Sequence, residues 1–274
     1  MMLRHSNNIT CSCFSIPAAD ALHWVTAMAA LFLIATILGG CGDHSKKTDV
    51  PAVGAAQILL FNGTGTSSND VAAIETVLSN GHLNYDSANS TELNRMSESQ
   101  IRGYHLLIIP GGNFIDIANS LDSSTTMNIH NAVQHGLNYL GICAGGFLAG
   151  NSAYYKCLNL TRGVAFSFYS AESQGIRKGV VAIASPGAPK LDQYWEDGPQ
   201  FTGWGSIVGK YPDNTPAIVE GTSGKAWVIL AGIHAEAPAA WRHGMIFNTP
   251  VGVDNAYAAM LIGAALNGTS LPHY

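Results

Sequence analysis

A cysteine flanked by small residues is the first candidate for chemistry in this chain. It is Cys143, in the run Gly141-Ile142-Cys143-Ala144-Gly145-Gly146. Small residues let a chain turn sharply from strand to helix and expose the side chain at the turn. A helix N-terminus behind the thiol favours the thiolate and offers backbone N–H groups to an oxyanion. The pattern predicts a nucleophile elbow; the alternative is a buried cysteine at a glycine-rich turn.

A histidine and a glutamate two residues apart supply the groups that such a nucleophile needs. Both lie in Gly232-Ile233-His234-Ala235-Glu236, directly after the apolar segment 226–230. Residues i and i+2 of an extended segment share a face, so Glu236 can orient the His234 ring. His234 can then take the proton of Cys143. We predict Cys143, His234 and Glu236 as the catalytic residues.

Glycine-rich loops after two predicted strands complete the candidate site, because the loops at the carboxyl ends of an open α/β sheet line its site. In Pro110-Gly111-Gly112-Asn113, the N–H of Gly112 is predicted to hold an oxyanion together with that of Ala144. The loop at 62–67, Asn-Gly-Thr-Gly-Thr-Ser, lacks the Lys of a Walker loop and is either an anion cradle or a plain turn. The predicted substrate-binding residues are Gly63, Thr64, Gly65, Asn113 and Trp204, the last because it lies between glycines.

Metal ligands do not stand out. The chain has 10 histidines, and the pair closest to the motif is His234 and His243. None has the ligand spacing with Cys or carboxylates that zinc sites show. We expect no metal and no cofactor.

The elements that must position these residues alternate between strand and helix. Apolar runs predict strands at 56–61, 82–87, 104–109 and 137–142, and helical spacing predicts helices at 69–80, 124–136 and 143–151. We expect Ser68 or Asn69 as the first N-cap. Shorter strands are predicted at 162–168, 179–184, 216–219 and 225–233, before a last helix at 254–266. This order predicts an α/β fold with a parallel, doubly wound sheet.

Taken together, these motifs resemble the class I glutamine amidotransferase-like superfamily. Within it, the chain is most similar to the amidotransferase-like domain at the N-terminus of biotin–protein ligases. The resemblance rests on segments 61–67, 107–113, 139–149, 201–205 and 224–236, and spans about residues 57–267. It implies a flavodoxin-like, mostly parallel sheet and a Cys-His-Glu triad.

The chain departs from that family pattern in several places. Position 235 is Ala where the superfamily usually has Pro, which we expect to loosen the Glu236 geometry slightly. The first-strand loop lacks the Glu that related DJ-1-type proteins place beside their Cys. We find no attached synthase and no biotin-ligase domain, so neither ammonia channelling nor biotin ligation is predicted.

Composition excludes several classes of protein. The chain has 274 residues, 47% hydrophobic and 11% charged, which is far below the roughly 25% charged residues of average soluble proteins. This apolar content excludes a largely disordered chain. A net charge of −5 excludes a dedicated nucleic-acid binder, since phosphates need a basic surface.

The N-terminal region predicts export. Residues 24–38 form an uncharged apolar run, shorter than the ~20 residues of a membrane-spanning helix. Leu38-Gly39-Gly40-Cys41 follows and resembles a bacterial lipobox. We therefore expect a signal peptide at 1–41 with lipidation of Cys41, a tether at 42–56, and a domain at 57–270. The alternative is an ordinary signal peptide. The expected location is the bacterial cell envelope, on the periplasmic face in a Gram-negative cell, with membrane contact through the lipid only.

Two functions remain open from the sequence. The first is a thiol amidohydrolase that acts on a small amide or a peptide through an acyl-thioester. The second is a non-catalytic domain that binds a small molecule or peptide in the same pocket.

Overall fold

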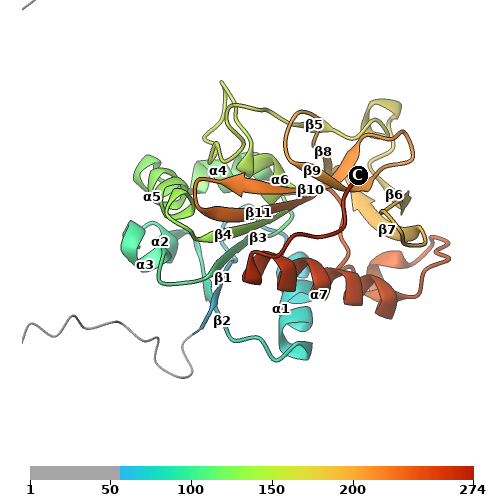
Figure 1. The fold of residues 1–274 in the computed structure, drawn as a ribbon, viewed down its shortest axis with the longest axis horizontal. Coiled ribbons are helices and arrows are strands. Elements are labelled where there is room, and N and C mark those ends of the chain that lie inside the picture. The colour runs from blue at the N-terminus through green and yellow to red at the C-terminus, as the bar shows by residue number, and fades with distance from the viewer. Residues whose placement is uncertain (1–55) are drawn as a thin grey trace, which may run out of the picture. The chain divides into compact units, whose positions relative to one another are not determined.

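The computed structural model describes residues 56–274 (Figure 1). The predicted signal peptide, Cys41 and the tether up to residue 55 lie outside the described residues. The C-terminus lies on the domain surface, where the N–H of Tyr274 donates to the carbonyl oxygen of Ile207 (Figure 1).

A 7-stranded sheet forms the centre of the domain, in the order β2-β1-β3-β4-β11-β10-β9. The first five of these strands are mutually parallel, while β10 and β9 add an antiparallel edge. The predicted doubly wound, mostly parallel α/β fold is confirmed. The strands are β1 (Ile58–Phe61), β2 (Tyr85–Ala88), β3 (Leu106–Ile109), β4 (Asn138–Ile142), β9 (Ser206–Lys210), β10 (Pro216–Ser223) and β11 (Ala226–Ala231).

Continuous apolar runs form the central strands because both faces of the sheet are covered. All four residues of β1 and all four of β3 are buried. Alternate side chains enter two separate cores: Leu60 and Ile108 face one, and Leu59 and Leu107 face the other. This burial on both sides explains why these segments show no polar alternation.

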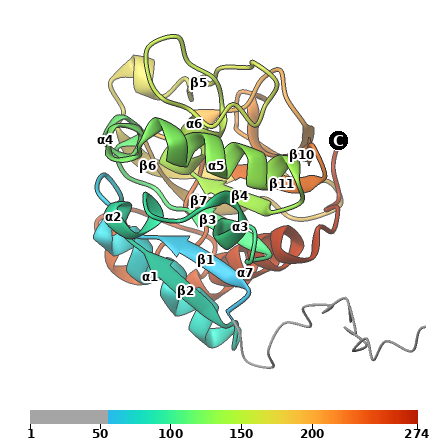
Figure 2. The same ribbon diagram turned by 90° about the vertical axis from the view of Figure 1, so that its left-hand side faces the viewer.

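The helices form one layer on each face of the sheet (Figures 1 and 2). Side chains of α1 and α7 enter the core on one face, and those of the other helices enter the core on the opposite face. The helices are α1 (Ser68–Asn80), α2 (Ser90–Leu93), α3 (Glu98–Ile101), α4 (Phe114–Ser120), α5 (Ser123–Gln134), α6 (Ala144–Ala149) and α7 (Val251–Asn267). Helices α2, α3 and α4 were not predicted, because each has seven residues or fewer and shows little apolar periodicity.

The N-cap of α1 differs from the prediction. It is Ser67, rather than Ser68 or Asn69, and its hydroxyl accepts the N–H of Asp70 at 3.4 Å. This cap sets the first turn of α1 against the carboxyl end of β1. It thereby directs Asp70 into the interior, where the side chain is 1% exposed.

The second half of the chain adds two small antiparallel pairs beside the main sheet. The hairpin of β6 (Lys178–Ile183) and β7 (Leu191–Glu196) borders the candidate site, and β7 was not predicted. The strand predicted at 162–168 is reduced to β5 (Ser167–Phe168), which pairs with β8 (Pro199–Gln200). Two short 3-10 helices, η1 (Glu172–Gln174) and η2 (Ala239–Arg242), complete the elements of residues 56–274.

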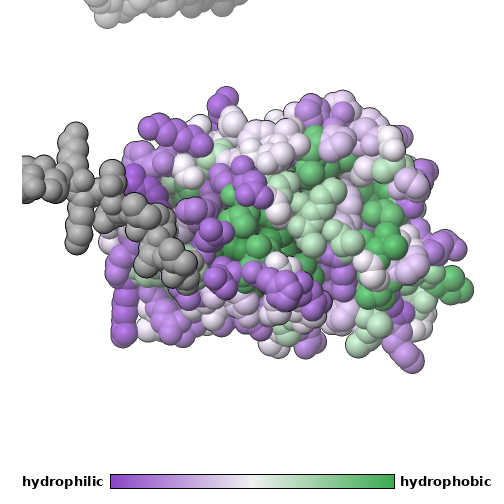
Figure 3. All heavy atoms as spheres, turned by 60° about the horizontal axis from the view of Figure 1, so that its bottom comes forward, coloured by the Kyte–Doolittle hydropathy of each residue, from purple (hydrophilic) through white to green (hydrophobic). Residues whose placement is uncertain are grey.

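Helix α7 is apolar on its outer face as well as its inner one. Figure 3 shows hydrophobic side chains gathered over this side of the domain. Val253 and Met260 on α7 are 45% and 40% exposed, and Ile246 just before it is 87% exposed. Within residues 56–274, no helix combines the length and apolar character needed to cross a membrane.

Candidate active site

Cys143 occupies a sharp turn between β4 and α6. Its backbone has φ 47° and ψ −103°, a conformation that L-residues avoid and that stores roughly 1–3 kcal/mol. The N–H of Cys143 donates to the carbonyl oxygen of Ala231 at 2.7 Å, which ties the turn to the end of β11. A Cβ on Gly145 would stand under 3.0 Å from the backbone of Ile109, so only glycine lets α6 begin this close to β3. The small residues of the motif are therefore required by packing at the elbow.

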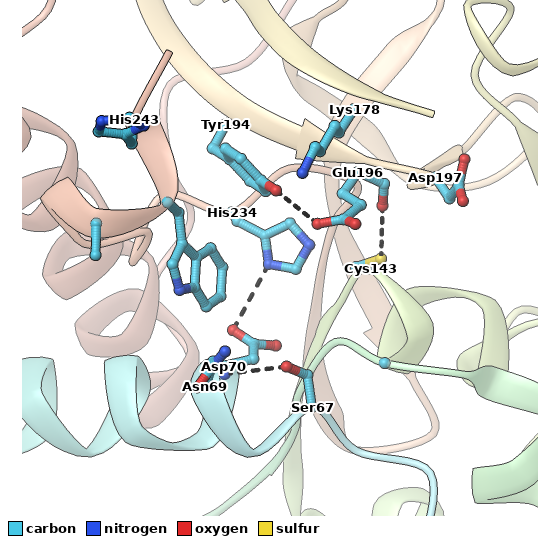
Figure 4. Close-up of a pocket in the computed structure, with 13 residues that line it drawn as sticks. Ser67, Asn69, Asp70, Cys143, Lys178, Tyr194, Glu196, Asp197, His234 and His243 are labelled. Atoms are coloured by element: carbon cyan, nitrogen blue, oxygen red, sulfur yellow. Dashed lines mark hydrogen bonds and ion pairs between the residues drawn. The ribbon is translucent and has the colours of Figure 1, made fainter. Parts of the chain in front are cut away.

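His234 lies after β11 and faces the cysteine. Figure 4 shows its ring between Asp70 and Cys143. The ring Nδ1 of His234 lies 2.7 Å from Oε1 of Glu236, and the backbone N–H of His234 donates to the carbonyl oxygen of Tyr194 at 2.9 Å. Nδ1 is thus engaged by the carboxylate side, which leaves the other ring nitrogen for the thiol. The Ala235 departure does not lengthen the His234–Glu236 contact.

A second acidic residue, Asp70, joins Cys143, His234 and Glu236 and was not predicted. Its Oδ1 lies 3.6 Å from His234 Nδ1, and its Oδ2 accepts the N–H of Gly111. We call Asp70, His234 and Glu236 the acid–imidazole cluster; each is at most 5% exposed. An acidic residue in the first turn of a helix usually interacts favourably with the helix dipole at the protein surface. The local pattern around Asp70 therefore does not predict that its side chain lies in the interior.

The cluster shifts the proton affinities of its members. Burial alone would lower the pKa of His234, but attraction to Glu236 and Asp70 outweighs it and raises that pKa well above 6.5. Burial, together with the charge of Asp70, raises the pKa of Glu236 to about 8. Burial would also raise the pKa of Asp70, yet His234 and the Gly111 N–H hold it below its ordinary value. The cluster therefore favours an imidazolium beside one carboxylate and one neutral carboxyl group.

A cleft of about 500 Å³ opens above Cys143 and His234. The hairpin β6–β7 forms one wall, and Trp241 of η2 packs edge to face with the His234 ring, with centroids 5.7 Å apart. Glu196 lines the cleft, and its carboxylate accepts the Tyr194 hydroxyl at 2.6 Å. Figure 4 shows this pair beside Cys143. The lining residues are Ser67, Asn69, Asp70, Gly112, Cys143, Lys178, Tyr194, Glu196, Asp197, His234, Ala240, Trp241 and His243.

One of the two predicted oxyanion donors, Gly112, lines the cleft at φ 143°; Ala144 directly follows Cys143 and is not among the lining residues. The loop of Gly112 pairs with the first-strand loop: the Ser67 N–H donates to Gly111 O, and the Asn113 N–H donates to Gly65 O. The Gly112 N–H takes no part in those two hydrogen bonds. The N–H of Ala144 is the first in α6 and has no acceptor within that helix. Neither N–H is used by these backbone hydrogen bonds.

The predicted substrate-binding residues do not line this cleft. The N–H of Thr64 donates to Ser90 Oγ at 3.0 Å in a separate depression, and Asn113 caps α4 by accepting the N–H of Ile115 at 3.0 Å. Gly63 packs against Phe61. Gly65 packs against the backbone of α4. The first-strand loop is therefore a support for the site rather than a cradle.

Trp204 lies in a different groove from Cys143. This groove is lined by Thr161, Arg162, Val164, Gly203, Trp204, Gly205, Gly221 and Thr222. The ring of Trp204 packs over Gly221 of β10. The flanking glycines both have positive φ, and a Cβ on Gly205 would stand 2.6 Å from the carbonyl oxygen of Glu220 on β10, so these glycines are explained by backbone conformation and packing. Residues that do line the cleft, such as Lys178 and Trp241, carried no recognisable sequence motif.

The acid–imidazole cluster is also the one group of described residues that brings three potential metal-ligand side chains together. One ligand atom from each lies within 4.8 Å of the others. A metal ion there would have to replace the contact between His234 Nδ1 and Glu236. Asp70 Oδ1 is buried and has no hydrogen-bond partner; its neighbour is His234 Nδ1 at 3.6 Å.

The second cysteine of the domain, Cys157, is not part of the site. Both Cys143 and Cys157 are free thiols. Burial raises the pKa of Cys157 to about 11, which disfavours its thiolate. Cys157 is therefore an internal reference for thiol reactivity.

Comparison with a family model supports the predicted resemblance. Residues 56–177, from just before β1 to just before β6, match the family described as the N-terminal region of biotin-protein ligase. The match includes Cys143, whereas His234 and Glu236 lie beyond it. No curated protein sequence matches the chain.

Solved structures share the fold. A glutamine amidotransferase matches with a TM-score of 0.53 and 16% identity, covering 69% of this chain and 96% of its own. PurLQS from Thermotoga maritima matches with a TM-score of 0.52 and 15% identity, covering 76% and 98%. A second glutamine amidotransferase from the same organism has a TM-score of 0.50 and 11% identity, covering 77% and 98%. At these low identities, the structural similarity shows a glutamine amidotransferase-like fold.

Proposed function

We propose that this domain, with its glutamine amidotransferase-like fold, is a cysteine amidohydrolase. The observation that carries the proposal is the arrangement of Cys143 on a strained elbow facing His234, whose Nδ1 lies 2.7 Å from Glu236. A strained turn that displays a thiol to an imidazole is a typical arrangement for a nucleophile, and a purely structural cysteine has no need of it.

The reaction begins from the ion pair in which His234 already holds the Cys143 proton, and the thiolate attacks an amide carbonyl carbon. The N–H groups of Gly112 and Ala144 hold the oxygen that becomes negative, each donor being worth roughly 3 kcal/mol by analogy with measured oxyanion holes. The C–N bond then breaks, and His234 gives its proton to the leaving amine. An acyl-thioester on Cys143 remains.

Water completes the cycle. His234 accepts a proton from a water molecule that attacks the thioester carbonyl, and the C–S bond breaks to restore the thiolate. One amide and one water become one carboxylic acid and one amine. The acid–imidazole cluster holds the imidazole in the same orientation through both half-reactions.

The proposed substrate is a small amide or a short peptide. The cleft of about 500 Å³ suits a small ligand. Its walls carry charges of both signs, from Lys178 on β6 and from Glu196 and Asp197 at the end of β7. A polar or zwitterionic substrate fits such walls better than an apolar one.

We also propose that the protein is exported and anchored by a lipid on Cys41. The motif Leu38-Gly39-Gly40-Cys41 supports this part of the proposal. Metabolic labelling with a fatty-acid analogue in a bacterial host should mark the wild type and fail to mark Cys41→Ser. Labelling of both proteins would refute lipidation at this residue.

The enzymatic proposal is tested by the rate of thiol alkylation. At pH 7, iodoacetamide should modify Cys143 at least ~100-fold faster in the wild type than in His234→Ala, because the imidazole takes the thiol proton. Peptide mapping after timed quenching separates Cys143 from Cys157, whose slow labelling should be the same in both proteins. His243→Ala, at the cleft rim, is the matched control and should keep the wild-type rate at Cys143. Equal, slow labelling of both cysteines would refute the hydrolase.

One contact favours the alternative of a binding domain without turnover. The Cys143 thiol donates to the main-chain carbonyl oxygen of Glu196, with Sγ 3.5 Å from the oxygen. A thiol that donates this hydrogen bond can serve as part of a pocket wall. If alkylation is slow while a ligand of the cleft protects the protein from thermal unfolding, the binding function replaces the enzymatic one.

A further inference from the structure

We propose that Asp70 is a positioning residue of this site: it is the counter-ion of His234 and ties the imidazole to the Gly111–Gly112 loop. This role deepens the proposed thiol chemistry and rests on it. The assignment of charge within the cluster can nevertheless be tested without any substrate.

Asp70 has two contacts that point in different directions. Oδ1 faces the imidazole, 3.6 Å from Nδ1, and Oδ2 accepts the N–H of Gly111. Gly111 precedes Gly112, the predicted oxyanion donor. A single carboxylate thus holds the base and the oxyanion loop in a fixed relation.

The packing around Gly111 shows how closely these groups are fitted. A Cβ on Gly111 would stand 2.6 Å from Asp70 Oδ2 and 2.6 Å from His234 Cε1. It would also stand 3.4 Å from Cys143 Cβ. Only glycine allows the loop to lie against acid, base and nucleophile together.

The contacts favour Asp70 over Glu236 as the charged carboxylate. A backbone N–H can donate to an ionised carboxylate, and Asp70 has such a donor in Gly111. The recorded hydrogen bond of the Glu236 carboxylate is to His234 Nδ1. Two buried carboxylates around one imidazole cannot both be charged without a large cost, so the proton stays on the less stabilised one.

Other charged and titratable groups face this cluster from neighbouring elements. Cys143 lies at the elbow, Tyr194 and Glu196 come from β7, and Lys178 comes from β6. Glu196 and Lys178 are exposed to solvent, whereas the cluster is buried. Water therefore screens their effect on His234 more than it screens that of Asp70.

The directions of the pKa shifts agree with this assignment. The pKa of Asp70 is held below its ordinary value, while the pKa of Glu236 is raised to about 8. At neutral pH the pair then holds one proton, on Glu236. The imidazolium that forms when Cys143 ionises is balanced by Asp70.

The direct test is a carboxyl titration by NMR, on full-length protein labelled with ¹³C at the carboxyl carbons of Glu and Asp. Glu236→Gln and Asp70→Asn identify the two signals by their disappearance. In the wild type at pH 6, we expect Asp70 to be ionised and Glu236 to be protonated. The opposite pattern, or two ionised carboxylates, would overturn the proposal, and this readout needs the variants only for assignment and not for activity.

The variant test uses Asp70→Asn, whose amide oxygen can still accept the Gly111 N–H. The Glu236 titration should move to lower pH by roughly 1–3 units, because the like charge is gone. The pKa of His234 should fall when its counter-ion Asp70 is removed. Alkylation of Cys143 at pH 7 should therefore slow by at least ~10-fold, the effect of about one pKa unit at His234.

The matched control is Asp116→Asn, since Asp116 lies in the first turn of α4 as Asp70 lies in that of α1. It should leave both the titration and the alkylation profile unchanged. If Asp70→Asn shifts the Glu236 titration while Cys143 of the wild type does not react with iodoacetamide, the proposed hydrolase function is refuted and the counter-ion role of Asp70 is supported. If Asp70→Asn shifts neither quantity, the counter-ion role fails.

Discussion

A Cβ on Gly112 would stand less than 3.0 Å from the carbonyl oxygen of Gly65. That same oxygen accepts the N–H of Asn113 at 2.8 Å. The first-strand loop and the Gly111–Gly112 loop are therefore in close backbone contact at Gly112, the proposed oxyanion donor. The relation gives the first-strand glycines a structural role: they shape the loop that holds the donor.

Gly112→Ala should consequently disable turnover while sparing the nucleophile. The new methyl group must push the two loops apart and displace the Gly112 N–H, so kcat/KM should fall by ~100-fold or more. Alkylation by iodoacetamide passes through no oxyanion and should change little. Gly187→Ala is the control, because its φ is also positive, at 67°, yet nothing lies within 4 Å of the added Cβ. Equal kinetics in the two variants would contradict an oxyanion role for this loop.

The protonated Glu236 should make stability depend on pH. Its pKa rises from an ordinary 4.5 to about 8 in the native state, so between these values the native state holds more protons than the unfolded chain. The free energy of unfolding should therefore fall as the pH rises from 5 to 8. The Glu236→Gln variant lacks this proton. Its free energy of unfolding should therefore fall less steeply with pH, by up to about 1.4 kcal/mol per pH unit.

Urea denaturation at pH 5, 6, 7 and 8 measures this difference. His234 contributes a loss of stability in the same direction, because its native pKa is also raised. Glu236 is one of the groups that raise the pKa of His234, so the difference between the two slopes contains both the proton of Glu236 and its effect on His234. Parallel curves for the wild type and Glu236→Gln would show that Glu236 ionises normally.

Trp241 and Trp204 should differ in their effect on binding. Trp241 lines the cleft beside His234, whereas Trp204 lies in a separate groove against β10. Trp241→Ala should raise the KM of an amide substrate by ~10-fold, about the value of one lost aromatic contact. Trp204→Ala should leave KM within about twofold by the same measure. A larger effect of Trp204→Ala would restore its predicted role in substrate binding.

The ion pair of Arg242 and Asp254 should support the cleft wall from beneath. Arg242 also donates to the carbonyl oxygen of Thr249 at 2.8 Å, and both charged side chains are at most 8% exposed. Arg242→Met leaves Asp254 buried without its partner and should cost about 3–5 kcal/mol of stability. The double variant Arg242→Met/Asp254→Leu should recover much of this loss. Urea denaturation of the two proteins checks the prediction, and a cost under about 1 kcal/mol for the single variant would contradict it.

Local patterns in the sequence were sufficient to predict most of the sheet and helices. The apolar runs that became β1, β3, β4 and β11 are readable because these strands are buried on both faces. Two kinds of element were missed: α2 has only four residues, and β7, with the sequence LDQYWE, mixes polar and apolar residues without a regular alternation. The elbow around Cys143 and the His234-x-Glu236 pair were also visible, since each motif lies within a few residues.

The remaining members of the site depended on contacts between distant segments. Asp70 reaches His234 only because the Ser67 cap orients α1 beneath β11, and no local pattern encodes that direction. Trp204 looked like a ligand contact between glycines, yet the same glycines let it pack over β10. The sequence by itself determined the fold class, the elbow cysteine and its histidine–glutamate pair. Only the tertiary structure decided which carboxylates surround the histidine and which walls enclose the cleft, because both follow from long-range packing.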